Sequence, residues 1–96
     1  MATLEARIYD GNRAREVLEN EVFNQVWADV EQELTKAWKE SPARDVEGRE
    51  KIFLTLQMLR KLHGAIQTTM ETGKLAQKEL EHQRTIADRA RAMWPR

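Results

Sequence analysis

The chain has 96 residues, of which one third are charged, with no net charge and no cysteine. These properties exclude a disulfide framework and a thiolate metal site, and the zero net charge argues against general binding to nucleic acid. A chain this short buries only about 60–65% of the surface of its unfolded form, so we expect self-association to supply part of its stability.

The first half is predicted to hold a short segment at residues 1–11 and one long helix at residues 12–40. Asp10-Gly11-Asn12 is typical of a turn, in which Asp10 or Asn12 can accept the first free backbone N–H groups of the helix. Apolar residues then recur at helical spacing over an arc of about 160°, which exceeds the roughly 100° that one packing partner requires. We therefore expect this helix to contact more than one neighbour.

Residues 41–45 predict a tight reversal of the chain. Pro42 cannot continue a helix, and either Ser41 or Asp45 can cap the helix that follows. That second helix is predicted to run from residue 46 to about residue 94. The fold class is therefore all-α, with an antiparallel helical hairpin in an oligomeric protein.

A stripe of residues at helical spacing predicts the buried face of the second helix: Ile52, Leu56, Leu59, His63, Ile66 and Met70. After Gly73 the apolar residues lie on a different face of the helix, about 100° around its axis from the stripe that ends at Met70. We therefore assign residues 46–73 to the hairpin and residues 74–96 to a C-terminal arm with another partner. This arm is either a docking arm for a second subunit or partner, or a frayed charged tail.

Charge is distributed unevenly along the chain. Residues 12–50 carry six basic and ten acidic side chains, net −4, whereas residues 51–96 carry nine and four, net +5. Complementary charge favours antiparallel packing of the two halves, within one chain or between chains.

Six residues on the apolar faces are predicted to form helix interfaces: Trp27, Trp38, Leu59, His63, Ile66 and Met70. His63 lies within the stripe, where a polar side chain sets the register between helices more often than it binds a metal. No second His or Cys stands at ligand spacing from it, so we expect no metal.

Arginine and lysine placement suggests an anion site, because guanidinium groups bind phosphate with a two-point geometry. The candidate ligand-binding residues are Arg84, Arg91, Trp94, Lys74, Arg44 and Arg49. Trp94 is also the best candidate for docking on another chain. Salt bridges between helices, using Asp88 and Glu81 on the same face as the arm's arginines, are the alternative interpretation.

No catalytic motif is present in the sequence. The segment at residues 71–74, Glu-Thr-Gly-Lys, lacks the first glycine and the final Ser/Thr of a phosphate-binding loop. No serine has a plausible base, so we expect neither an enzyme nor a cofactor. Because no stretch approaches the roughly 20 apolar residues of a membrane helix, we also expect a cytoplasmic protein without membrane contact.

Several stretches resemble a group of short, uncharacterised helical proteins of tailed bacteriophages and their prophages. They are residues 41–51 (SPARDVEGREK), 52–62 and 71–76 (ETGKLA), together with residues 8–14 and 18–21. The resemblance implies a phage protein in the cytoplasm of an infected bacterium, or in the virion, and implies no site residues.

Two classes of function fit such a protein. One is an oligomeric binding protein directed at the host, an inhibitor or a sponge for a nucleotide immune signal, with a basic pocket and an aromatic ring. The other is an assembly protein, such as a minor virion, scaffold or packaging-associated component, whose outer surface carries the contacts. Homo-oligomers, a host protein or a small nucleotide are the expected partners, and duplex nucleic acid is disfavoured.

Overall fold

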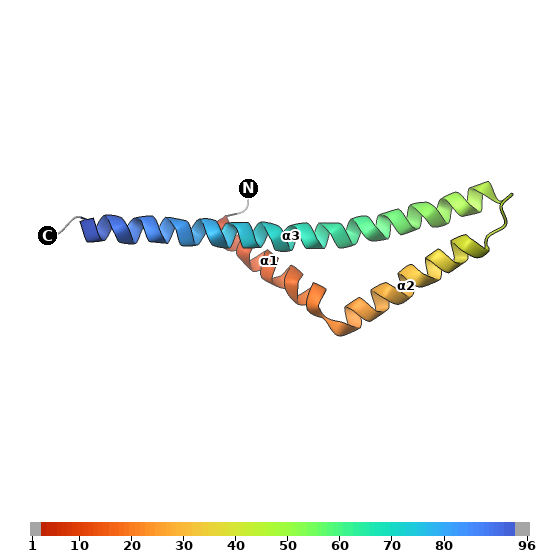
Figure 1. Ribbon diagram of the computed structural model, residues 1–96, viewed down its shortest axis with the longest axis horizontal. Coiled ribbons are helices and arrows are strands. Elements are labelled where there is room, and N and C mark those ends of the chain that lie inside the picture. The colour runs from red at the N-terminus through yellow and green to blue at the C-terminus, as the bar shows by residue number, and fades with distance from the viewer. Residues whose placement is uncertain (1–2, 94–96) are drawn as a thin grey trace.

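The computed structural model describes residues 3–93, which form three α-helices. The helices are α1 (Leu4–Glu19), α2 (Glu21–Glu40) and α3 (Val46–Met93). Figure 1 shows α3 as a long rod, with α2 returning from one end of it and α1 crossing it near the middle. The molecule measures 80 × 25 × 16 Å, and its radius of gyration of 21.6 Å far exceeds the value of about 12.5 Å for a compact domain of this length.

The break in the first half lies at Asn20, so the prediction of a turn at residues 10–12 and of one helix at 12–40 is wrong. Residues 10–12 lie inside α1. The Asn20 backbone is extended, with φ −73° and ψ 121°, and its Oδ1 accepts a hydrogen bond from the Phe23 N–H at 2.8 Å. The Asn24 side-chain amide donates to the Leu18 carbonyl at 2.9 Å. These bonds satisfy backbone groups at both helix ends, which makes Asn20 a more favourable break.

The predicted reversal at residues 41–45 agrees with the structure. Asp45 caps α3, because its Oδ1 accepts a hydrogen bond from the Gly48 N–H at 3.0 Å. The Ser41 hydroxyl instead donates to the Trp38 carbonyl at the end of α2. Of the two candidate caps, Asp45 is therefore the one that begins α3, and Ser41 ends α2.

The predicted stripe on α3 faces the rest of the chain. Leu56 is buried, and the other five members are half-buried: Ile52, Leu59, His63, Ile66 and Met70. The rings of Trp27 and His63 lie 5.1 Å apart between centroids, and those of Phe23 and Trp27 lie 5.5 Å apart. Aromatic contacts therefore join α2 to α3 along this stripe.

The α1–α3 crossing is built on two glycines that lie inside helices. A Cβ atom placed on Gly11 would lie 2.7 Å from the Gly73 Cα, and one placed on Gly73 would lie 2.9 Å from the Arg7 carbonyl oxygen. Ala14 and Ala76, one turn further along each helix, are also buried. Small side chains therefore allow the two backbones to touch.

The start of the C-terminal arm packs on α1 of the same chain. Gly73 and Ala76 pack against α1, whereas every residue from 81 to 93 is exposed. α3 continues through Gly73 without a break. The change of phase at Gly73 therefore marks a change of packing partner from α2 to α1, whose residues 4–11 were predicted to lie outside any helix.

Burial is slight for a chain of this length. Among residues 3–93, the buried hydrophobic residues are Ala14, Leu56 and Ala76, and many larger ones are exposed. An extended shape with so small a core is consistent with an oligomer. Within the same residues, no helix combines the length and hydropathy that a membrane crossing requires.

Candidate functional site

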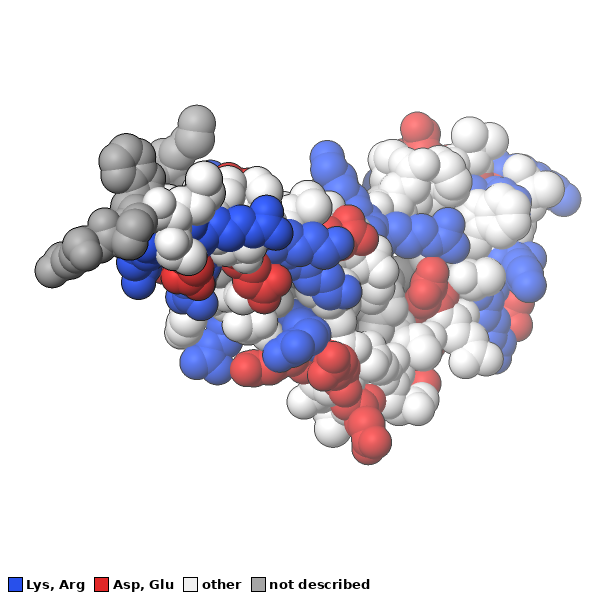
Figure 2. All heavy atoms as spheres, turned by 60° about the vertical axis from the view of Figure 1, so that its left-hand side comes forward, with Lys and Arg blue, Asp and Glu red and all other residues white. Residues whose placement is uncertain are grey.

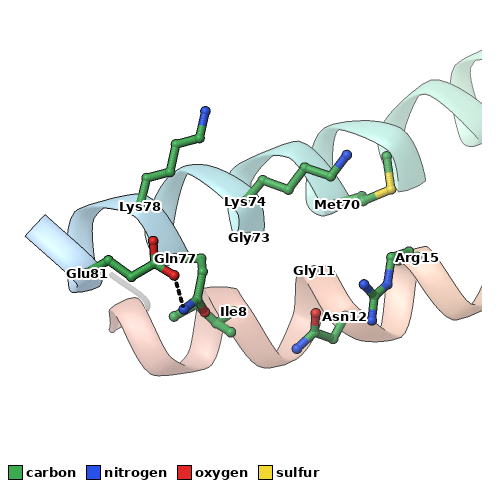
Figure 3. A pocket seen from close by; sticks show the side chains of 10 residues that line it. All are labelled: Ile8, Gly11, Asn12, Arg15, Met70, Gly73, Lys74, Gln77, Lys78 and Glu81. Atoms are coloured by element: carbon green, nitrogen blue, oxygen red, sulfur yellow. Dashed lines mark hydrogen bonds between the residues drawn. The ribbon is translucent and has the colours of Figure 1, made fainter.

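A groove of about 350 Å³ opens where α1 crosses α3 (Figure 3). Residues of both helices line it: Ile8, Gly11, Asn12, Arg15, Met70, Gly73, Lys74, Gln77, Lys78 and Glu81. The two glycines bring the helices into contact, so side chains within about two turns of them on each helix form the walls. The groove therefore depends on the glycine crossing.

Three of the four charged residues that line this groove are cationic. Arg15 comes from α1, and Lys74 and Lys78 come from α3. Glu81 is the single carboxylate among the lining residues, and its Oε1 accepts a hydrogen bond from Gln77 Nε2 at 3.1 Å. The lining therefore carries a formal charge of +2, and the side chains are exposed enough to reorient around an anion.

Basic side chains also gather on the surface beyond the groove. Figure 2 shows Lys and Arg side chains gathered over the half of the molecule that carries the C-terminal part of α3, with carboxylates among them. This placement agrees with the excess of basic residues in residues 51–96. An anion approaching the groove therefore meets a favourable local field despite the zero net charge.

Arg13, two residues before Arg15, is engaged on the outer side of α1. Its guanidinium lies 5.0 Å from the centre of the Tyr9 ring and 3.0 Å from a Glu16 carboxylate oxygen. Hydrogen bonding to Tyr9, followed by that to Glu16, raises the pKa of Arg13. Arg13 therefore does not contribute to the groove.

One chain does not bring the predicted ligand-binding residues together. Lys74 lines the groove, whereas Arg84 is exposed further along α3 and Arg91 lies 3.6 Å from the Asp88 carboxylate. Arg44 is exposed in the reversal, at the other end of the molecule. The prediction for Trp94 lies outside the described residues.

Arg49 stabilises the reversal. Its guanidinium donates hydrogen bonds to the Ser41 carbonyl and hydroxyl oxygens, at 3.1 and 2.9 Å, and to the Trp38 carbonyl at 3.3 Å. It also lies 4.4 Å from the centre of the Trp38 ring. Arg49 thus caps the end of α2 from α3, and Trp38, a predicted interface residue, contacts the same chain here.

The groove residues that the sequence interpretation missed are mainly those of α1. The sequence suggests Asp10 or Asn12 as a helix cap and does not single out Arg15, nor Lys78 of α3. The available signal was a matched spacing of small residues, Gly11 with Ala14 and Gly73 with Ala76. Such pairs permit close helix crossings, but a sequence does not show which pairs meet.

The charged side chains of the groove are exposed to solvent. Within residues 3–93, no polar or charged residue is buried, and no group of three His, Asp or Glu side chains is placed to hold a metal. The groove can attract an anion and donate hydrogen bonds to it.

Comparison with protein-family models, with curated proteins and with solved structures found no match to this chain.

Proposed function

We propose that the protein is a non-enzymatic, oligomeric bacteriophage protein that binds a small phosphorylated ligand of its host, as a sponge for a nucleotide signal or an inhibitor. The observation that carries this proposal is the groove at the α1–α3 crossing, whose lining includes Arg15, Lys74 and Lys78 and the carboxylate of Glu81. Phosphate oxygens are favourable partners for such cations. The bacteriophage context rests on the sequence resemblance.

The groove of one chain supplies cations but no aromatic ring among its lining residues. A nucleotide base therefore requires a ring from another part of the assembly, which is one reason to propose an oligomer. The ring of Trp94 is the candidate, because it follows the exposed part of α3. The site would then combine the groove of one subunit with the arm of another.

Native mass spectrometry of the purified protein, before and after denaturation, tests this function. A closed oligomer that releases a phosphorylated molecule on unfolding supports it. Added cyclic dinucleotides and ADP-ribose should raise the melting temperature of the wild type. Lys74→Gln should abolish the increase, and Arg89→Gln, a charge-matched change outside the groove, should preserve it. No increase with any of these probes, and no retained molecule, would contradict ligand binding.

The second candidate is an assembly role, as a minor virion, scaffold or packaging-associated component. The extended shape of 80 × 25 × 16 Å and the exposed apolar residues favour it. An assembly protein presents its contacts along its outer surface, where these residues lie. Co-purification with capsid or packaging proteins from infected cells, without any effect of nucleotides on melting, is the result that distinguishes this role.

A further inference from the structure

Six of the large exposed apolar side chains lie on one side of the α2–α3 hairpin, whereas Val46 and Phe53 are exposed on the other side of α3. We call this surface the open face, and it consists of Val22, Val26 and Val30 of α2 and Leu54, Met58 and Leu62 of α3, which are 37–71% exposed. Six large exposed apolar side chains at helical spacing on two adjacent helices are unusual for an isolated surface.

The contacts between the helices show that the two rows share one side of the hairpin. Trp27 contacts His63, and the salt bridge between Glu31 and Arg60, at 3.2 Å, lies to one side of that contact. At about 100° per residue, the apolar rows lie on the other side of the contact in both helices. The open face is therefore opposite the salt bridge.

The same side of α3 is covered further along the chain. Met58 and Ala76 are 18 residues apart, about five full turns, so they point in the same direction from α3. Ala76 is 3% exposed because α1 packs on it, whereas Met58 is 64% exposed. α1 thus covers this side of α3 at one end of the contact region and leaves it open at the other.

Complementary charge favours a second copy of this chain as the occupant. α2 carries five acidic and two basic residues, net −3, whereas residues 46–62 of α3 carry four basic and two acidic residues, net +2. When two open faces meet with α2 of each copy over α3 of the other, opposite charges are apposed. The other symmetric arrangement, α2 over α2, apposes like charges.

Individual residues at the rims agree with this arrangement. Trp27 is level with His63 in the antiparallel hairpin, so Asp29 is level with Lys61. Helical spacing from Val26 places Asp29 at the α2 edge of the open face, and spacing from Leu54 places Lys61 at its α3 edge. Rotation of a second copy by 180° about an axis along the helices therefore places its Lys61 beside Asp29, twice in the dimer.

We propose that the open face is a self-association site at which a second copy of this chain docks, with α2 of each subunit on α3 of the other. The result is a four-helix bundle with an apolar centre and two Asp29–Lys61 pairs at its rims. This interface does not depend on a ligand in the groove. Failure of this proposal would therefore leave the proposed binding function unaffected, and the reverse also holds.

The absence of native cysteine allows a direct test with engineered thiols. Full-length Asp29→Cys and Lys61→Cys proteins, mixed and mildly oxidised, should form a disulfide-linked heterodimer in high yield. Asp29→Cys alone should give at least tenfold less linked dimer. Efficient linkage of Asp29→Cys to itself, or no linkage in the mixture, would overturn the arrangement.

Sedimentation equilibrium provides an independent test with variants that change only exposed residues. Asp29→Lys and Lys61→Glu should each weaken self-association at least tenfold, and the double variant should restore it to within about threefold. Met58→Asp should weaken it at least tenfold, whereas Gln67→Asp, an exposed control on another side of α3, should not. Wild-type affinity in Met58→Asp, with unchanged circular dichroism, would contradict the open face as the interface.

Discussion

Gly11 and Gly73 meet inside the α1–α3 crossing, with a space so limited that a methyl group on Gly11 would lie 2.7 Å from the Gly73 Cα. The two residues are 62 positions apart in the chain, and both lie within helices. Glycine weakens a helix by up to about 1 kcal/mol relative to alanine. Here the missing side chains allow α1 to pack on α3 and to form the groove beside it.

Because of the glycine crossing, Gly→Ala substitutions should change the stability of the protein in opposite directions at different positions. Gly11→Ala or Gly73→Ala should destabilise the protein by about 1–3 kcal/mol, because the added methyl group collides with backbone atoms. Gly64→Ala should stabilise it by up to about 1 kcal/mol, because apart from the neighbouring residues and backbone of the same helix no atom lies within 4 Å of the added methyl group. Urea denaturation followed by circular dichroism measures all three. Equal stabilisation by the three substitutions would contradict a close crossing.

The position of the first helix break predicts different effects at two asparagines. Asn20→Ala should cost about 1 kcal/mol, because the Phe23 N–H loses its acceptor. Asn12→Ala should be neutral or stabilise by a few tenths of a kcal/mol, because residue 12 lies in the interior of α1. Thermal denaturation at fixed protein concentration measures both changes. If Asn12→Ala proved the more destabilising, the break would lie at the turn that the sequence suggested.

The role of Arg49 predicts a loss of stability rather than a loss of ligand affinity. Arg49→Gln should destabilise the protein by about 1–2 kcal/mol, since the Ser41 and Trp38 oxygens lose their donor and the Trp38 ring loses its cation. Arg44→Gln, which removes the same charge from an exposed position in the reversal, should change stability by less than about 0.5 kcal/mol. Chemical denaturation compares them. Indistinguishable stabilities would mean that the Arg49 contacts contribute nothing.

The contact between Trp27 and His63 predicts a measurable coupling across the hairpin. A double-mutant cycle with Trp27→Leu and His63→Leu should give a coupling free energy of about 0.5–1.5 kcal/mol, the usual value for paired rings. As a control, a cycle that pairs Trp27→Leu with Ile86→Ala on the exposed part of α3 should be additive within about 0.5 kcal/mol. Additivity in both cycles would show that the two rings do not stabilise each other.

The sequence by itself determined the all-α class and the reversal at residues 41–45, and it predicted a long helix after the reversal; the continuity of that helix through Gly73 came from the structure. Each of these predictions depends on local chemistry. Pro42 cannot donate a hydrogen bond to a helix, and the spacing from Ile52 to Met70 repeats with the helical period, so the buried face of α3 follows from the residues alone.

Only the tertiary structure decided the meaning of Gly11 and the position of the groove. A glycine flanked by Asp10 and Asn12 is typical of a turn when it is considered alone, and only its contact with Gly73 explains it as a crossing point. Likewise, the cations of the groove come from two helices whose approach depends on that contact. Local propensity differs little between a turn and a helix crossing at such a glycine, and a long-range contact decides between them.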